Sequence, residues 1–289
     1  MIFGAIIQLI IIILLLILLY YIYRPIPLRS LYEKYLVAVS NHDESMVSVI
    51  GEHVLYNTVY QIKKISNKSN KLVVWFHGGG FIKEKAVNII PFLVYLSEQC
   101  NVDVLTFDYP LPYKCRLDDT LVYISQILNK FFSENSKYDY IYFGGDSAGA
   151  YLALKILELQ YNEAFRMYLN VEPVHADVTA FIGVCGFYDP TFGNKPLALP
   201  LFNSWFWNVR NITFYKTCNV RCPSLIISST QDFLVFQSRR FVDRQPRNLV
   251  TFRQFTTPNT IHCFISNTKL PETIEATSDM CEFINRVVG

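Results

Sequence analysis

The sequence predicts an α/β fold, in which a mainly parallel central sheet carries helices on both faces. Apolar, strand-like runs alternate with predicted helices along most of the chain, an order typical of right-handed βαβ units. Two glycine-rich motifs, residues 77–80 and 144–149, each follow directly on a predicted strand. The chain has 289 residues, which is enough to bury a sizeable core.

The chain begins with an apolar segment, residues 2–23, in which no residue is charged and only Gln8 is strongly polar. A helix of this length spans about 33 Å, and the hydrocarbon core of a bilayer measures about 30 Å. A cleaved signal peptide is the alternative, but the run is too long and no small-residue cleavage site follows it. We therefore expect an uncleaved helix that anchors a single-pass membrane protein.

Two features bear on which side of the membrane the rest of the chain lies. Arg24, Arg29 and Lys34 follow the apolar segment, and the positive-inside rule then places the rest in the cytosol. Glycosylation sequons at Asn67 and Asn211 suit a lumenal location instead. Because sequons also arise by chance in a chain so rich in Asn, the orientation stays open.

Residues 24–70 are expected to form a linker and the first strands, with a strand pair within residues 47–65. One main domain is expected over residues 71–289. It opens with the continuous apolar run 71–76, which predicts a strand buried on both faces. Further strands are predicted at residues 102–107, 140–143, 180–184, 224–228 and 249–255. Helices are predicted at residues 87–98, 118–132, 148–157, 238–244 and 272–287.

Charge and cysteine spacing exclude several kinds of partner. The net charge is +2 and the basic residues are scattered, so we expect no nucleic-acid-binding surface. The seven cysteines show no CxxC pair and no zinc-site spacing with His, so we expect no metal and no other cofactor. Buried thiols are expected rather than a disulfide framework; the cysteines are residues 100, 115, 185, 218, 222, 263 and 281.

Residues 145–149 have the Gly-x-Ser-x-Gly pattern of a nucleophile elbow, with Ser147 at the centre. A predicted strand precedes the pattern and a predicted helix follows it, as the elbow requires. A Cβ at Gly145 or Gly149 would clash with the neighbouring strand or helix, which explains the two glycines. Such a turn lifts the Ser147 hydroxyl out of the sheet, where it can act as a nucleophile.

The second motif, His77-Gly78-Gly79-Gly80, also follows a predicted strand. Acyl transfer turns a carbonyl oxygen into an oxyanion, which preorganised backbone N–H groups stabilise. We expect the N–H groups of Gly79, with Gly78 or Gly80, and of Ala148 to form this oxyanion hole. His77 is interpreted as a scaffold for the loop rather than as a base.

An acid and a base are expected to follow the nucleophile in the order Asp or Glu, then His. His262 follows the last predicted strand, whereas His175 lies too early to follow an acid in a later loop. Asp232 follows the strand 224–228, whereas Asp243 falls within a predicted helix. We therefore expect Ser147, Asp232 and His262 to form a catalytic triad.

These motifs resemble those of the hormone-sensitive-lipase-like branch of the α/β-hydrolases, over residues 70–289. The resemblance rests on residues 77–80 and 145–149, and also on the segments around Asp232 and His262. It implies an α/β-hydrolase fold and a serine carboxylesterase that works through an acyl-enzyme. With the apolar anchor, the chain is most similar to the membrane-anchored arylacetamide deacetylases and fungal steryl acetyl hydrolases. That similarity implies a catalytic domain in the lumen of the endoplasmic reticulum.

Two residues depart from the pattern of that branch. Pro110 replaces an Arg in the segment Phe-Asp-Tyr-Pro-Leu, and Phe236 replaces a second acid after Asp232. Both departures concern substrate binding and the loop of the acid, and neither concerns the nucleophile.

The resemblance also implies a small cap over the site, formed by N-terminal helices and by an insertion at residues 186–220. This insertion is dense in aromatic residues, and aromatic side chains beside a catalytic groove bind apolar groups. We expect Phe81, Trp205, Phe206 and Trp207 to contact a lipophilic ester with a short acyl or acetyl group.

Three functional interpretations remain open: an esterase or deacetylase, an amidase such as a formamidase, and a non-catalytic binding protein on a hydrolase scaffold. Gly80 disfavours the amidase, because such relatives often carry an aromatic residue at that position. The intact set of Ser147, Asp232 and His262 disfavours the binding protein. The sequence does not set the oligomeric state.

Overall fold

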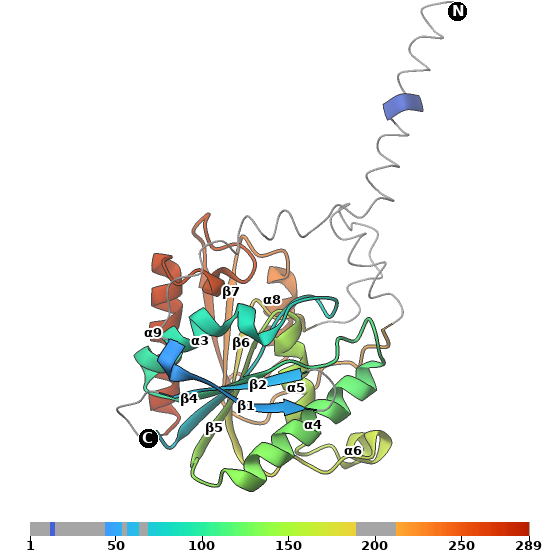
Figure 1. The fold of residues 1–289 in the computed structure, drawn as a ribbon. Helices are drawn as coiled ribbons and strands as arrows, with labels where there is room; N and C mark the ends of the chain where they lie inside the picture. Colours follow the sequence, from blue (N-terminus) through green and yellow to red (C-terminus); the bar gives the residue numbers. More distant parts are fainter. Residues whose placement is uncertain (1–11, 15–43, 54–56, 64–68, 189–211, 289) are drawn as a thin grey trace, which may run out of the picture.

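The structure is a computed structural model that describes residues 12–14, 44–53, 57–63, 69–188 and 212–288 (Figure 1). The predicted anchor lies outside these residues except for 12–14, which are helical. Within the described ranges, none of the helices is long and apolar enough to cross a membrane. Most of the predicted linker, and the cap insertion from residue 189 to 211, also lie outside the described residues.

The described residues form an 8-stranded sheet in the order β1-β2-β4-β3-β5-β6-β7-β8. The strands β1 and β2 pair antiparallel, as do β2 and β4, and every later pairing is parallel. The mainly parallel sheet is therefore confirmed. The strand bounds are β1 Val47–His53, β2 Asn57–Ile62, β3 Lys71–Phe76, β4 Asp103–Phe107, β5 Tyr140–Asp146, β6 Val178–Val184, β7 Ser224–Ser229 and β8 Val250–Phe255.

Helices alternate with the parallel strands and lie on both sides of the sheet (Figure 1). Their bounds are α3 Ile90–Cys100, α4 Leu117–Glu134, α5 Ala148–Glu158, α6 Glu163–Leu169, α8 Val235–Asp243 and α9 Pro271–Arg286. Helix α6 was not predicted, because only two of its seven residues, Phe165 and Leu169, are buried and they show no sustained period. Helix α8 begins at Val235, three residues before the predicted start.

The core has two layers, one on each face of the sheet. Leu72, Val74 and Phe76 of β3 join a cluster with α4 and α5, while Val73 and Trp75 join a cluster with α3 and α9. Side chains of a strand alternate between the two faces, so an apolar run packs against both layers. This burial confirms that the strand beginning at Lys71 is enclosed on both faces.

A disulfide joins the two helices of one layer, between Cys100 at the end of α3 and Cys281 in α9. The prediction of buried free thiols is therefore wrong for this pair. The two residues are 181 positions apart, so no local spacing marked them as partners. The fold brings them together because α3 and α9 pack side by side on one face of the sheet.

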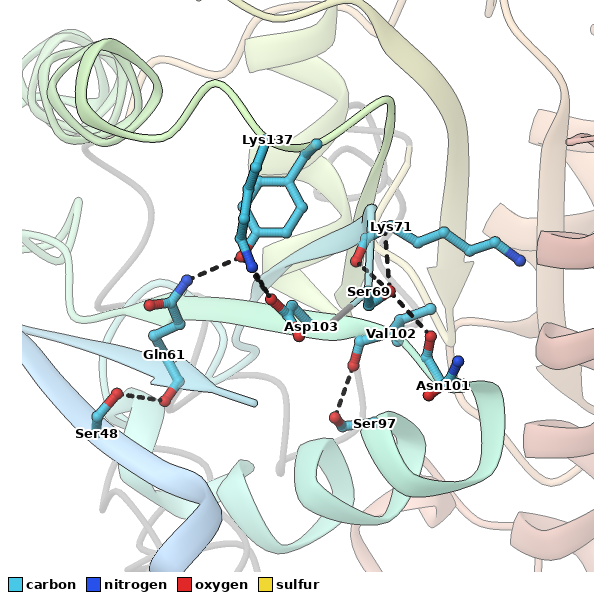
Figure 2. Close-up of polar contacts among 10 residues, drawn as sticks. Ser48, Gln61, Ser69, Lys71, Ser97, Asn101, Val102, Asp103 and Lys137 are labelled. Carbon is cyan, nitrogen blue, oxygen red and sulfur yellow. Dashed lines mark hydrogen bonds and ion pairs between the residues drawn. The ribbon is translucent and has the colours of Figure 1, made fainter. Parts of the chain in front are cut away.

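The amino ends of the parallel strands are held by a polar cluster (Figure 2). Buried Asp103, at the start of β4, accepts hydrogen bonds from Lys137 Nζ at 2.8 Å and the Tyr138 hydroxyl at 2.7 Å. Gln61 of β2 donates to that hydroxyl at 3.0 Å, and Ser97 of α3 donates to the Val102 carbonyl. This cluster ties β2, β4 and the turn before β5 together, at the sheet edge opposite to the carboxyl end of β5.

Candidate active site

Ser147 lies in the turn between the carboxyl end of β5 and the first residue of α5. Its backbone has φ 51° and ψ −118°, a conformation that non-glycine residues rarely adopt. Its N–H donates to the Val184 carbonyl at 3.0 Å, and its carbonyl accepts from the Phe187 N–H at 2.9 Å. The turn is thus held by the neighbouring strand β6 and by the segment that follows it.

The two glycines around Ser147 allow close contacts that no larger residue permits. A Cβ on Gly145 would lie 2.7 Å from the Gly149 carbonyl carbon, in the first turn of α5. A Cβ on Gly149 would lie 2.0 Å from the Phe76 carbonyl oxygen, at the end of β3. The predicted reason for both glycines is confirmed, since one faces the helix and the other faces the strand.

The structure brings Ser147, His262 and Asp232 into one hydrogen-bonded chain. The Ser147 Oγ lies 2.9 Å from His262 Nε2, and His262 Nδ1 lies 2.8 Å from Asp232 Oδ1. Asp232 follows β7 and His262 follows β8, so both stand at the carboxyl edge of the sheet beside the elbow. Asp232 Oδ1 also accepts the Leu234 N–H at 2.9 Å, which fixes the carboxylate.

The two rival residues lie apart from this chain. His175 is exposed in the loop before β6, where its N–H donates to Asn129. Asp243 is the exposed last residue of α8. Neither makes a hydrogen bond to Ser147 or His262 in the described part of the chain.

The glycine-rich loop begins with His77, which is buried directly after β3. Its ring stacks on Tyr109 with centroids 4.2 Å apart, and its carbonyl accepts from the Tyr109 hydroxyl at 2.5 Å. Burial lowers the pKa of His77 to about 4, so the ring is neutral at pH 7. The geometry agrees with a scaffold role for His77.

The loop turns at Gly79 and Gly80, whose φ angles are 108° and 63°. The Gly79 carbonyl accepts from the N–H groups of Ile82 and Lys83, which closes the turn. Ala148 opens α5, where the first N–H groups of a helix have no partner within the helix. The loop and the helix start lie against each other through the contact between Gly149 and the end of β3.

Asp146 is a further residue of the site, and no role was predicted for it. Its Oδ1 accepts from the Trp75 indole N–H at 3.0 Å, and its Oδ2 accepts from the Cys263 thiol at 3.5 Å. A Cβ on Gly78 would lie only 2.3 Å from the same Oδ2. The carboxyl group thus lies against the glycine loop and is bonded to the residue after His262. Burial raises its pKa to about 6.

Among the predicted substrate contacts, the structure describes Phe81, while Trp205, Phe206 and Trp207 lie outside the described residues. Phe81 is buried, in a cluster with Tyr151, Phe187 and Phe214 at centroid distances of 5.7, 5.4 and 5.0 Å. Because Phe187 donates its N–H to Ser147, this aromatic cluster begins directly beside the elbow.

Two exposed aromatic residues follow Asp232 in sequence and were not predicted to contact the substrate. Phe233 follows Asp232 and packs against His262, with ring centroids 4.2 Å apart, and is 48% exposed. Phe236, in the first turn of α8, is 65% exposed. For Phe236 the signal was present in the sequence, because this residue replaces the second acid of the family's pattern. We call this pair the rim aromatics.

One group of described residues has the composition of a metal site: Cys185, Asp232 and His262, whose ligand atoms lie within 4.8 Å of one another. Two of them belong to the hydrogen-bonded chain with Ser147. Cys185 follows β6, is buried, and its pKa is raised well above the usual range by that burial.

The sequence from residue 73 to 266 matches a protein-family model described as alpha/beta hydrolase fold. The chain belongs to this family. Both glycine motifs and all three members of the hydrogen-bonded chain lie inside the matched segment of this alpha/beta-hydrolase. A search of the curated proteins found no match.

Solved structures share the fold of this alpha/beta-hydrolase at low sequence identity. Esterase B from Lactobacillus rhamnosis, in an inhibited form, matches with a TM-score of 0.74 and 17% identity, over 90% of this chain and 93% of that chain. The same esterase was also solved as inhibited by a tributyrin phosphonate. A Pyrobaculum calidifontis esterase matches with a TM-score of 0.69 and 17% identity, over 92% and 95%. A thermophilic carboxylesterase from a metagenomic library matches with a TM-score of 0.70 and 16% identity, over 92% of this chain and 98% of that chain.

Proposed function

We propose that this alpha/beta-hydrolase is a serine carboxylesterase that cleaves carboxylic esters through an acyl-enzyme. The observation that carries the proposal is the hydrogen-bonded chain from Ser147 through His262 to Asp232 beside a glycine loop. A hydroxyl is a weak nucleophile at neutral pH and gains reactivity from a base within hydrogen-bond reach, itself oriented by a third group. All three groups are present in that order.

In the proposed reaction, Ser147 Oγ attacks the ester carbonyl and His262 Nε2 takes its proton. Asp232 holds the proton on Nδ1 and stabilises the imidazolium that forms. The N–H groups of the glycine loop and of Ala148 stabilise the oxyanion. His262 then protonates the leaving alcohol, and a water molecule activated by the same base releases the acid from Ser147. The neutral, buried His77 supports the loop and takes no proton in these steps.

The proposed substrate is a lipophilic ester with a short acyl group. The aromatic cluster beside Ser147, with buried Phe81 and Phe187, makes that side of the site apolar. Phe233, one of the rim aromatics, offers exposed apolar surface beside His262, where the alcohol leaves. Inhibition of the similar Lactobacillus esterase by a tributyrin phosphonate supports a short acyl chain.

The proposal includes an anchor at residues 2–23 and a catalytic domain in the lumen of the endoplasmic reticulum. The anchor rests on the length and apolar composition of that segment. The lumenal side is supported by the Cys100–Cys281 disulfide, because disulfides persist in oxidising compartments and are rare in the cytosol. The basic residues after the anchor argue for the opposite side.

Turnover of matched substrates tests the proposed activity. The full chain, purified in detergent, is expected to hydrolyse p-nitrophenyl acetate and butyrate faster than p-nitroacetanilide, the corresponding amide. Ser147→Ala should abolish ester turnover, while Ser136→Ala, an exposed serine, should leave it unchanged. Faster cleavage of the amide than of the ester would favour an amidase. A folded wild type without turnover of either substrate would favour a non-catalytic binding protein.

A further inference from the structure

A sulfur, an oxygen and a nitrogen atom converge beside the nucleophile, on Cys185, Asp232 and His262. These residues follow the neighbouring strands β6, β7 and β8, so the sheet brings three separate loops to one point. Their ligand atoms lie within 4.8 Å of one another. The proposed hydrolysis uses Asp232 and His262 but gives the Cys185 thiol no role.

One carboxylate oxygen of Asp232 also lacks a strong hydrogen-bond donor. Oδ1 accepts from His262 Nδ1 and the Leu234 N–H, whereas buried Oδ2 has no nitrogen or hydroxyl donor within the described part of the chain, and the Cys185 thiol is the further donor to this carboxylate. The side chain is 0% exposed, so bulk water does not solvate this oxygen. A thiol is a weak hydrogen-bond donor, so it compensates the buried carboxylate poorly, and a cation bound between the two groups would stabilise the charge.

We propose that Cys185, Asp232 and His262 form a site for a zinc-type divalent cation, and that the bound cation inhibits the hydrolase. Cysteine sulfur, histidine nitrogen and carboxylate oxygen are the ligands that zinc takes in proteins. Ligand atoms in a tetrahedral zinc site are about 3.5 Å apart, so the ion would shorten the widest separations, which reach 4.8 Å, and would separate His262 Nδ1 from Asp232 Oδ1, which are 2.8 Å apart. One thiolate and one carboxylate balance the charge of the ion, which makes the buried site neutral.

The proposed inhibition depends on which ring nitrogen of His262 binds the ion. His262 Nδ1 faces Asp232 and Nε2 faces Ser147, so the ion binds Nδ1. The Cys185 thiol releases its proton to solvent, and the proton on Nδ1 moves to Nε2. Nε2 then carries a hydrogen and no longer accepts the Ser147 proton. The His262 side chain is 12% exposed and the Asp232 side chain is 0% exposed, so solvent reaches the site at the His262 ring. Inhibition rests on the proposed function, whereas binding of the metal does not.

Cobalt binding and zinc inhibition test the site on the full chain in detergent. Co²⁺ should give a thiolate-to-metal charge-transfer band in the wild type, and Zn²⁺ should inhibit ester turnover reversibly, with recovery on adding a chelator. Cys185→Ser should lose the band and need at least about tenfold more Zn²⁺ for half-inhibition, relative to its own metal-free rate. Cys263→Ser is the matched control, because Cys263 is also buried but bonds to Asp146.

Two further variants separate this proposal from the proposed function. Ser147→Ala keeps all three ligands and should show the cobalt band without any turnover. Asp232→Asn should weaken the cobalt band. If Cys185→Ser does not fold, Asp232→Asn takes its place in the metal-binding measurement. A wild type without the band, or equal zinc inhibition of wild type and Cys185→Ser, overturns the site whatever the ester assay gives. A band without turnover overturns the hydrolase and retains the site.

Discussion

Asp146 shows how a residue can serve the site through its neighbours. Its carboxyl group binds Trp75 of β3 on one side and Cys263, next to His262, on the other. It also lies against Gly78 at the start of the oxyanion loop. One buried group therefore sets the relative position of the nucleophile turn, the glycine loop and the loop of the base.

The raised pKa of Asp146 makes stability depend on pH in a predictable direction. The unfolded chain loses this proton near pH 3.8, but the folded chain loses it only near pH 6, because burial disfavours the charge. This contribution to stability is full below pH 3.8 and is lost as the pH rises through about 6. We expect the wild type to lose stability relative to Asp146→Asn across that window.

Urea unfolding at several pH values measures this difference. The effect of His77, whose lowered pKa acts in the opposite direction, is common to both proteins and cancels. Asp139→Asn, a change on an exposed carboxylate, should show no such trend relative to the wild type. A difference between wild type and Asp146→Asn that stays flat from pH 4 to pH 7 would contradict the assignment.

The rim aromatics are expected to select the alcohol part of the substrate. Phe233→Ala removes apolar surface beside His262 and should raise KM for esters of bulky apolar alcohols by about tenfold. KM for methyl or ethyl acetate should change little, because these alcohols do not reach the ring. Ile274→Ala in α9, an exposed apolar residue of another element, is the control. Equal effects of Phe233→Ala on both kinds of ester would refute this selectivity.

At the scale of elements, α3 and α9 are joined covalently although they lie far apart in sequence. Closing so long a loop in the unfolded chain lowers its entropy, and losing a native disulfide typically costs about 2–5 kcal/mol. We expect Cys100→Ser to lower the free energy of unfolding by that amount under non-reducing conditions. Guanidinium unfolding measures it.

Two comparisons check the disulfide. Cys115→Ser, which removes a free and partly buried thiol, should unfold close to the wild type. Reductant should lower the stability of the wild type to that of Cys100→Ser. If Cys100→Ser and the wild type unfold at the same denaturant concentration without reductant, the helices are not linked in solution.

The sheet could be predicted because its strands carry local signals. The run from Leu72 to Phe76 is apolar throughout, and both glycine motifs stand where a strand ends. Helix α6 lacks a helical period of apolar residues, so no local signal marked it. Cys100 and Cys281 come together only through the packing of two helices that are distant in sequence. Local pattern therefore gave the order of elements but not the contacts between them.

Some contacts of the candidate site could likewise be predicted from the sequence, and others could not. Ser147, Asp232 and His262 could be placed by their order after strands, and the structure brings them together. The contacts of Asp146 and the position of Cys185 depend on loops from several strands, which a linear motif does not describe. The packing of Phe233 against His262 also depends on the fold, and no local sequence pattern predicts it.

At the scale of the whole molecule, the proposed anchor implies a side of the membrane for the catalytic domain. A disulfide and two sequons favour the lumen, while the basic flank of residues 2–23 favours the cytosol. We expect the full chain in eukaryotic microsomes to be protected from added protease until detergent is present. We also expect endoglycosidase treatment to lower its apparent mass.

Sequon variants assign the modified residues. Asn67→Gln and Asn211→Gln should each remove one mass shift, whereas Asn101→Gln, which lies outside any sequon, should remove none. Digestion of the domain in intact microsomes would place it in the cytosol and contradict the lumenal proposal.

The central claim is that Ser147 is the nucleophile of an acyl-transfer site, and covalent trapping tests it most directly. A fluorophosphonate reacts with a serine that a neighbouring base activates, so the full chain should gain one phosphonyl group. Peptide mass spectrometry should place this group on Ser147, and Ser147→Ala and His262→Ala should prevent labelling in folded protein. Labelling of another serine, or a folded wild type that stays unlabelled, would contradict the account.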